Sequence, residues 1–422
     1  MTTRELAVKT LYEITYNGAF SNIAVKDALA GREMSKQDRD FFSRIVYGTL
    51  DKELTLDYMI TRLSKIKLKK ISKYILIILR TGLYQIKFMD SVPDSAAVNE
   101  SVRLARRYGH SASAGYVNGL LRNAAKTEIP YPEDNVKYLS VKYSFPEEMC
   151  EKWIGDFGFD FTEKLMQAFE KPQPLILRPN TLKTNAEELC ERFGTKGITA
   201  EVRGGAVYAD GFDVAGDSLY REGFYTVQDT AAMQSAIVLN PQPGEKVIDM
   251  CAAPGGKTTQ MAEMMQNKGK IFAFDIYPHK VELIKKNAER LGITIISAQT
   301  GDASKPIKEL CGTADKILCD VPCTGTGIIG RKPDIKRSRE NKEPITALQR
   351  KILDNAAQYL KQGGELLYST CSIEKEENEG VTDGFIAENP DFEKIYEKTF
   401  YPHIDGTDGF YICRIRRVNE ND

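Results

Sequence analysis

The chain has 422 residues, 42% of them hydrophobic and 28% charged, which is the composition of a globular protein of about three domains. No apolar run is long enough to span a bilayer and the N-terminus lacks the apolar stretch of a signal peptide, so we expect a cytoplasmic protein with no membrane partner. The eight cysteines form no Cys-x-x-Cys pair and the three histidines do not lie near them, which argues against a metal site and a disulfide scaffold.

Charge is distributed unevenly along the chain. Residues 1–128 contain 21 Lys and Arg against 13 Asp and Glu, a net of +8, which leaves 37 against 46, a net of −9, for the remainder. A basic front end on an acidic body indicates a polyanionic partner. A Lys-rich, solvated helical surface would give the same count, so charge alone leaves both interpretations open.

Residues 1–130 are predicted to form an all-α domain. Apolar residues recur at helical spacing in four stretches, 6–14, 41–46, 70–88 and 95–107. Ser35 is a candidate N-cap for the second of them. The two prolines within Thr127–Asp134 predict a linker.

Residues 138–225 are predicted to form a small α+β domain that links the other two. Strand patterns at 174–180, 198–203 and 206–210 alternate with a helical stretch at 186–193. Gly204 and Gly205 join the last two strands.

Residues 226–422 are predicted to form an α/β domain. Strand-like runs alternate here with stretches of helical periodicity such as 280–291 and 346–360. The five strand-like runs are 246–250, 270–275, 294–298, 316–320 and 365–369. Such alternation predicts a parallel, doubly wound, Rossmann-like sheet. Ligands of these sheets bind outside the carboxyl ends of the strands.

The first of these strands leads into Asp249-Met-Cys-Ala-Ala-Pro-Gly-Gly-Lys-Thr-Thr259. Glycines between a strand and a helix let a ligand approach exposed backbone N–H groups. The spacing matches neither common phosphate-binding loop, and a tight turn that only needs glycine is the structural alternative.

Aspartates stand at or just after the ends of four strands, namely Asp249, Asp275, Asp302 and Asp320. An acidic residue after the second strand of a doubly wound sheet often accepts hydrogen bonds from a ribose, and Asp275 has that place. A single aspartate could be a helix cap or turn former, but four in series favour a ligand site.

Two cysteines, Cys323 and Cys371, follow the fourth and fifth strands and are therefore expected at the same sheet edge. No histidine lies near either one in the sequence, so a protease-like dyad is not expected. The remaining cysteines outside the glycine-rich loop are expected to be small buried hydrophobic residues: Cys150, Cys190, Cys311, Cys319 and Cys413.

Three motifs together resemble those of RNA cytosine-5 methyltransferases, namely DMCAAPGGKT, DVPCTGTG and STCS. The helical front end resembles a NusB-like RNA-binding domain. The resemblance covers nearly the whole chain and is closest to the branch that acts on 16S ribosomal RNA. Thr324 stands where serine is common in the family, and Arg337 where an aromatic residue is often found.

The resemblance implies transfer of a methyl group from S-adenosylmethionine to cytosine C5 through a covalent cysteine–C6 adduct. Position alone does not name the nucleophile, and Cys323 is the rival because the Pro-Cys cysteine attacks in DNA cytosine-5 enzymes. The resemblance to the RNA enzymes assigns the nucleophile to Cys371, product release to Cys323 and binding of the base near N3 to Asp320. It places Asp275 on the cofactor ribose and Asp302 near the adenine. Asp320 would also border the cofactor, and the rest of the cofactor site would be Cys251, Ala252, Ala253, Pro254, Gly255, Gly256 and Lys257.

The partner implied is 16S rRNA, free or in an early assembly intermediate, bound by a monomer. Residues 138–225 would contact this RNA as well as link the other two domains. A catalytically silent RNA-binding or antitermination-like protein is the main alternative, but the chain has both cysteines and all four aspartates. A small-molecule methyltransferase would leave the basic front end without a role.

Overall fold

The computed structural model describes residues 1–209, 211–337 and 345–418. Its contacts divide the chain into two compact units. One holds residues 1–170 and the segment from Lys332 to Arg337, and the other holds residues 171–331 with the C-terminal part of the chain. The domain boundaries at 1–130, 138–225 and 226–422 stay predictions.

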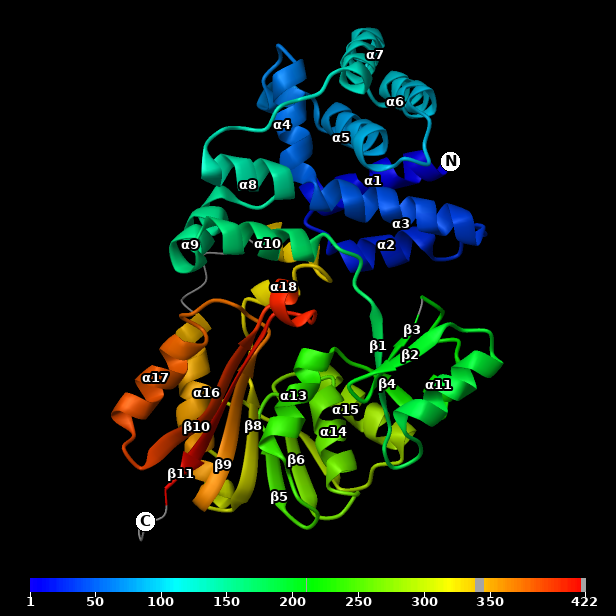
Figure 1. Cartoon of the computed structure of the whole chain (residues 1–422). Helices are drawn as coiled ribbons and strands as arrows, with labels where there is room; N and C mark the ends of the chain where they lie inside the picture. The colour runs from blue at the N-terminus through cyan, green and yellow to red at the C-terminus, as the bar shows by residue number, and fades with distance from the viewer. Residues whose placement is uncertain (210, 338–344, 419–422) are drawn as a thin grey trace. The chain divides into compact units, whose positions relative to one another are not determined.

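The first unit is helical, as predicted for the front of the chain (Figure 1). Its helices are α1 Thr3–Tyr16, α2 Ser21–Leu29, α3 Lys36–Asp51, α4 Glu53–Leu63, α5 Lys73–Phe88, α6 Asp94–Tyr108, α7 Ser111–Lys126, α8 Asn135–Tyr143, α9 Glu147–Phe157 and α10 Phe159–Phe169. Ser35 caps α3, because its hydroxyl accepts the Asp38 N–H at 3.1 Å. Residues 127–134 contain neither helix nor strand, as expected of a linker.

Helix α5 is the core of this unit. Every residue from Ile75 to Gln85 is buried, and α1, α3, α4, α6 and α7 all pack against the helix. A helix that is buried around its whole circumference needs other elements packed against every side. The short 3-10 helix η4, Pro333–Arg337, also belongs to this unit and contacts α3.

The second unit begins with a small antiparallel sheet in the order β2-β3-β1-β4. Its strands are β1 Leu175–Pro179, β2 Ala200–Arg203, β3 Ala206–Ala209 and β4 Tyr225–Val227, accompanied by helices α11 Ala186–Thr195 and α12 Ser218–Arg221. This arrangement confirms the predicted α+β class of this part of the chain. Asp210, the last residue of the strand predicted at 206–210, lies outside the described residues.

The large sheet has seven strands in the order β10-β11-β9-β8-β5-β6-β7. They are β5 Lys246–Asp249, β6 Lys270–Asp275, β7 Ile296–Thr300, β8 Ala314–Asp320, β9 Leu360–Thr370, β10 Phe392–Phe400 and β11 Phe410–Arg417. The five predicted strands pair in parallel, which confirms the doubly wound class. Strands β10 and β11, which the sequence analysis did not predict, extend the sheet in antiparallel fashion.

Helices cover both faces of the large sheet (Figure 1). One face packs against α13 Thr230–Leu239, α14 Gly256–Met264 and α15 Pro278–Leu291. The other face packs against α16 Ile345–Tyr359 and α17 Glu379–Glu388. The short helix α18 Pro402–Asp405 precedes β11. Double burial explains why the central strands β5, β6 and β8 contain continuous apolar runs rather than alternating ones. None of the described helices is long and apolar enough to cross a membrane.

Candidate active site

The candidate site lies where the strand order of the large sheet reverses. From β5 the chain continues to β6 and β7 on one side, and later to β8 and β9 on the other. Doubly wound sheets bind their ligands at this switch point, outside the carboxyl ends of the strands. The predicted site residues come from the ends of these five strands and from the loops that follow them.

The loop between β5 and α14 has the close turn that its glycines predict. Gly255 has φ +104°, and a Cβ atom there would lie 3.3 Å from the Ile284 Cα. The Ala253–Pro254 peptide bond is cis, and the Asn287 side chain donates a hydrogen bond to the Pro254 carbonyl at 2.9 Å. The loop therefore passes close to α15 and leads directly into the N-terminus of α14.

Asp249, the last residue of β5, is 1% exposed. Its Oδ2 accepts a hydrogen bond from the Thr258 hydroxyl at 2.7 Å, whereas its Oδ1 has no partner among the described residues. Burial raises the pKa of Asp249 to about 7. A buried acceptor without a partner beside a glycine loop suits a polar group of a bound cofactor.

Lys257 and Asp320 form an ion pair at the same edge. The Lys257 Nζ donates to the Asp320 Oδ2 at 2.7 Å, and the Ser369 hydroxyl donates to the other carboxylate oxygen at 2.8 Å. Burial lowers the pKa of Lys257, but the charges of Asp320, Cys371 and Asp249 outweigh it and leave that pKa above its usual value. The ammonium therefore stays charged, and its electrostatic interaction with Cys371 shows that a cation lies near this sulfur.

Asp275 and Asp302 stand where the sequence placed them, but their surroundings differ. Asp275 is 8% exposed at the end of β6, next to β5, and its Oδ1 accepts the Tyr277 N–H at 3.0 Å. Asp302 accepts hydrogen bonds from Ser304 and lies 3.1 Å from the Lys305 Nζ. The Ser304 bonds and the Lys305 charge lower the pKa of Asp302, so this carboxylate also organises its own turn.

The two cysteines meet at the ends of β8 and β9. The Cys323 and Cys371 sulfur atoms are 3.1 Å apart. Their hydrogen bond, together with burial, raises the pKa of the Cys323 thiol well above its usual value. The Gly327 N–H donates to the Cys371 carbonyl at 2.9 Å, and a Cβ on Gly327 would lie 2.0 Å from the Gly409 carbonyl oxygen, so only glycine fits there.

Glu377 is a site residue that the sequence analysis missed. It is 3% exposed, and its carboxylate accepts hydrogen bonds from the Thr324 hydroxyl, the Thr324 N–H at 2.9 Å, the Ser372 hydroxyl at 2.9 Å and the Gln349 amide at 3.0 Å. Thr324 follows Cys323 and Ser372 follows Cys371, so this one carboxylate holds both cysteine loops. In the sequence, Glu377 lies in the charged run Glu374–Glu379, and such a run is typical of a solvated surface, so nothing local marked it as a site residue.

Arg178 of β1 is a second residue that the sequence analysis missed. Its guanidinium donates to the Gly256 carbonyl at 2.6 Å, the Thr259 hydroxyl at 3.0 Å and the Glu263 carboxylate at 2.8 Å. Arg178 and Glu263 are both buried. The small sheet therefore holds the first turns of α14, immediately after the glycine loop.

Comparison with known proteins matches three parts of the chain to described families. Residues 236–416 match "16S rRNA methyltransferase RsmB/F", residues 1–126 match the NusB family, and residues 145–213 match the ferredoxin-like domain of RsmF/B-like methyltransferases. The protein named "Probable ribosomal RNA small subunit methyltransferase B" of Bacillus subtilis is 36% identical, with 98% of each chain covered.

The chain belongs to the ribosomal RNA small subunit methyltransferase B family. A family member from Shewanella oneidensis is 30% identical over 99% of this chain and 100% of its own. The crystal structure of PH0851 has a TM-score of 0.79 and 30% identity and covers 97% of both chains. A methyltransferase homologue from Pyrococcus horikoshii has a TM-score of 0.60 and 29% identity over 68% of this chain and 100% of its own.

Membership of this methyltransferase family confirms that S-adenosylmethionine is the cofactor. The residues at the end of β5 fit it, because the glycine loop permits close approach and Asp249 offers a buried acceptor without a partner. When bound, S-adenosylmethionine supplies an electrophilic methyl group.

The five cysteines outside the candidate site are not all buried. Cys150, Cys319 and Cys413 are buried as predicted, but Cys190 is only partly buried and Cys311 is exposed. The expectation of a buried Cys311 was wrong, because this residue follows a short 3-10 helix, Lys308–Leu310, at the surface.

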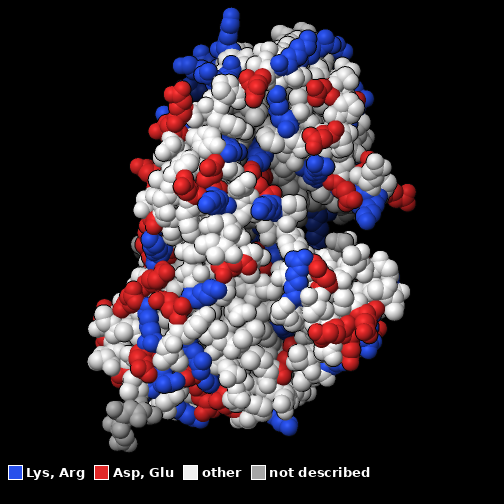
Figure 2. Space-filling view, in the orientation of Figure 1, with Lys and Arg blue, Asp and Glu red and all other residues white. Residues whose placement is uncertain are grey.

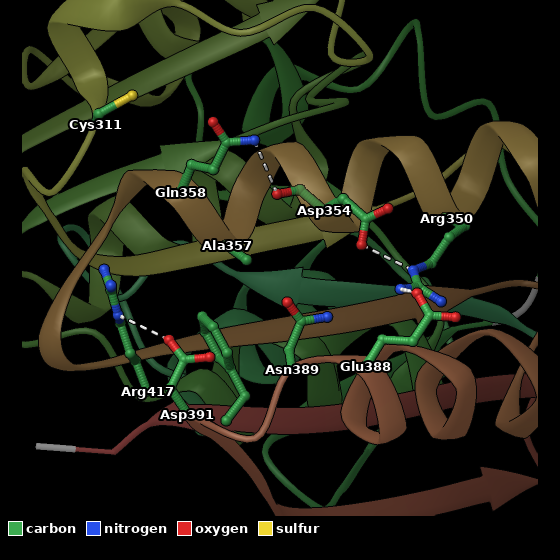
Figure 3. Close-up of a pocket in the computed structure, with 10 residues that line it drawn as sticks. Cys311, Arg350, Asp354, Ala357, Gln358, Glu388, Asn389, Asp391 and Arg417 are labelled. Atoms are coloured by element: carbon green, nitrogen blue, oxygen red, sulfur yellow. Dashed lines mark hydrogen bonds and ion pairs between the residues drawn. The ribbon is translucent and has the colours of Figure 1, made fainter.

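A hollow of about 610 Å³ lies elsewhere on the second unit, near the start of β9 rather than its end (Figure 3). Its charged groups already pair with each other, since Arg350 contacts Asp354 and Glu388, and Arg417 lies 3.6 Å from Asp391. The glycine loop and the two strand-end cysteines do not line it. We therefore place the chemistry at the strand ends and not in this hollow.

Proposed function

We propose that this chain methylates C5 of a cytosine in 16S rRNA through a covalent bond between Cys371 and C6 of the base. The observation that carries the proposal is the pair of cysteine sulfurs 3.1 Å apart, beside the Lys257–Asp320 ion pair. The family match supports 16S rRNA as the substrate. A human relative that is 30% identical over 72% of this chain and 42% of its own is named a 28S rRNA cytosine-C5 methyltransferase, which supports C5 of cytosine as the methylated atom.

A nucleophile is needed because C5 of cytosine is too electron-poor to attack a methyl group directly. The Cys371 sulfur forms a bond to C6, and the electrons of the C5–C6 double bond then make C5 nucleophilic. C5 accepts the methyl group and afterwards loses its proton to a base. The electrons of that C–H bond re-form the double bond as the sulfur leaves C6.

The surroundings of the two thiols support Cys371 as the nucleophile. Lys257 is a cation close to Cys371, and thiolates, not thiols, attack. The raised pKa of Cys323 keeps this second thiol protonated, which suits a group that assists release. Asp320, held by Lys257 and Ser369, is placed to bind the base near N3, and its ion pair borders the cofactor loop.

The remaining carboxylates and the partner complete the proposal. Asp275 binds the cofactor ribose, and Asp302 lies near the adenine. The base must be unstacked to reach the cysteines, which costs less in a loop than in a duplex. The chain acts as a cytoplasmic monomer on free 16S rRNA or an early assembly intermediate.

The test separates the two cysteines in single-turnover reactions with a 16S rRNA transcript and S-adenosylmethionine. We expect Cys371→Ala to give neither product nor covalent adduct. Cys323→Ala should attack and methylate but stall before release, which leaves an RNA–protein band on a denaturing gel.

Cys311→Ala is the matched control and should behave like the wild type, because this exposed cysteine lies outside the site. A persistent adduct from Cys371→Ala, or the absence of one from Cys323→Ala, would contradict the assignment.

A further inference from the structure

The connection between α4 and α5 carries most of the excess positive charge of residues 1–128. Arg62–Lys73 holds six Lys or Arg and no acidic residue, out of the net +8 for the whole region. The nearest acids in the sequence are Asp57 and Asp90. The positive charge of the front end is therefore densest in this short segment, whereas the five Lys or Arg of residues 101–127 are spread over a much longer stretch.

The lysines of this connection are exposed and uncompensated. Lys65, Lys67, Lys69 and Lys70 are exposed, and the structure gives them no ion pair within its described residues. Figure 2 shows Lys and Arg side chains gathered over the end of the helical unit where α4 ends. Four unpaired ammonium groups within six residues repel each other, so an anion bound there would stabilise them.

The connection is ordered by contacts of its own. The Ser64 hydroxyl accepts the Ile66 N–H at 2.9 Å and lies 2.6 Å from the Tyr116 hydroxyl of α7. The 3-10 helix η1, Leu68–Lys70, completes the turn into α5. The lysines are thus presented from a defined backbone.

A hollow of about 380 Å³ lies within the connection. It is lined by Thr61 and residues 64–69, and Ile66, at its centre in the sequence, is 42% exposed. An apolar side chain among lysines offers a contact for a sugar or base while the ammonium groups contact phosphates.

We propose that residues 62–73 are an RNA-binding surface that contacts the phosphates of the ribosomal RNA substrate. This inference rests on the proposed function and names the surface that holds its substrate. RNA is favoured over a lipid surface, because Ile66 is the one large apolar side chain exposed in the segment, and membrane binding needs a broader apolar face.

The experiment compares two full-length variants that each lose four exposed lysines of the helical unit. K65Q/K67Q/K69Q/K70Q removes the charges of the connection, and K9Q/K26Q/K36Q/K164Q removes four elsewhere on that unit. Binding to a 16S rRNA transcript is measured from 50 to 300 mM salt. Matched melting temperatures establish that both variants are folded.

We expect the connection variant to bind about 10- to 100-fold more weakly and its salt slope to fall by about 3, since each phosphate contact to a single strand adds about 0.7. The control variant should keep the wild-type slope. Equal slopes for the two variants would overturn the proposal, as would loss of binding to anionic phosphatidylglycerol vesicles with RNA binding unchanged.

Methylation of the same transcript is measured separately. Its absence in the wild-type protein would overturn the proposed function, while the binding comparison would still decide the RNA surface.

Discussion

At the scale of single residues, Glu377 is the side chain on which the geometry of the two cysteines depends most. Its carboxylate accepts four hydrogen bonds, two from Thr324 and one each from Ser372 and Gln349. A buried carboxylate with this many donors is rigid, and each donor would be costly to leave unpaired. We infer that Glu377 positions both cysteine loops without touching substrate.

Glu377→Gln should therefore lower kcat by about 10- to 100-fold, because one or two lost hydrogen bonds of about 1.4 kcal/mol displace the reacting sulfurs. The affinity for S-adenosylmethionine, measured by calorimetry, should stay within about twofold of wild type, since the glycine loop proposed to bind the cofactor follows β5, away from Glu377 in the chain.

Glu388→Gln is the control, because this carboxylate is exposed and pairs with Arg350 away from the site. Equal losses in kcat and cofactor affinity for Glu377→Gln would indicate general unfolding instead of a positioning role.

At the scale of elements, strand β1 and helix α14 are joined by a buried ion pair. Arg178 binds both the Glu263 carboxylate and the Gly256 carbonyl, so one guanidinium supports the helix and the loop that precedes it. Burial raises the pKa of Glu263, and the Arg178 charge opposes that rise. The small sheet therefore supports the helix that follows the glycine loop.

Arg178→Met should lower the free energy of unfolding by about 3–5 kcal/mol, because it leaves Glu263 buried without its cation. The double variant Arg178→Met/Glu263→Met should regain most of that stability. It should still bind S-adenosylmethionine about tenfold more weakly, because roughly 1.4 kcal/mol of loop positioning is lost with the Gly256 contact. Thermal unfolding and calorimetry measure the two effects, and wild-type cofactor affinity in the double variant would contradict the positioning role.

At the scale of the whole molecule, the chain uses a segment from between β8 and α16 to complete the helical unit. Lys336 is buried there, with its Nζ 2.7 Å from the Asp51 carboxylate, 3.2 Å from the Tyr143 carbonyl and 4.1 Å from the centre of the Phe145 ring. Asp334 adds a hydrogen bond with Ser21. The helical unit is therefore incomplete when built from residues 1–170 alone.

Lys336→Met should destabilise the helical unit by about 1–3 kcal/mol, because the Tyr143 carbonyl and Asp51 lose their donor. Trp153, the single tryptophan of the chain, is buried in this unit with its ring 5.6 Å from Phe145, so its fluorescence during urea denaturation reports the change. Lys332→Met is the control, since Lys332 is exposed on the same segment. An unchanged fluorescence midpoint for Lys336→Met would mean that the segment adds no stability.

Much of the site could be predicted because its residues follow strands with strong local patterns. Apolar runs ending in Asp249, Asp275 and Asp320 identify parallel strands, and parallel strands end at one edge. Glu377 could not be predicted in this way, because the charges of Glu374–Glu379 look alike in the sequence and only packing buries one of them. Strands β10 and β11 were missed because charged residues interrupt their apolar residues, whereas the central parallel strands contain continuous apolar runs.

By itself, the sequence determined the helical character of the front of the chain, the α/β alternation of its last part and the sheet edge that carries the candidate site, since these follow from periodicity between near neighbours. Only the tertiary structure decided that Cys323 and Cys371, 48 residues apart, lie 3.1 Å from each other. Only it decided that Lys336, in a basic stretch that resembles a surface patch, is buried in the helical unit. The physical reason is that such contacts depend on which distant segments share a core, and local patterns do not encode that choice.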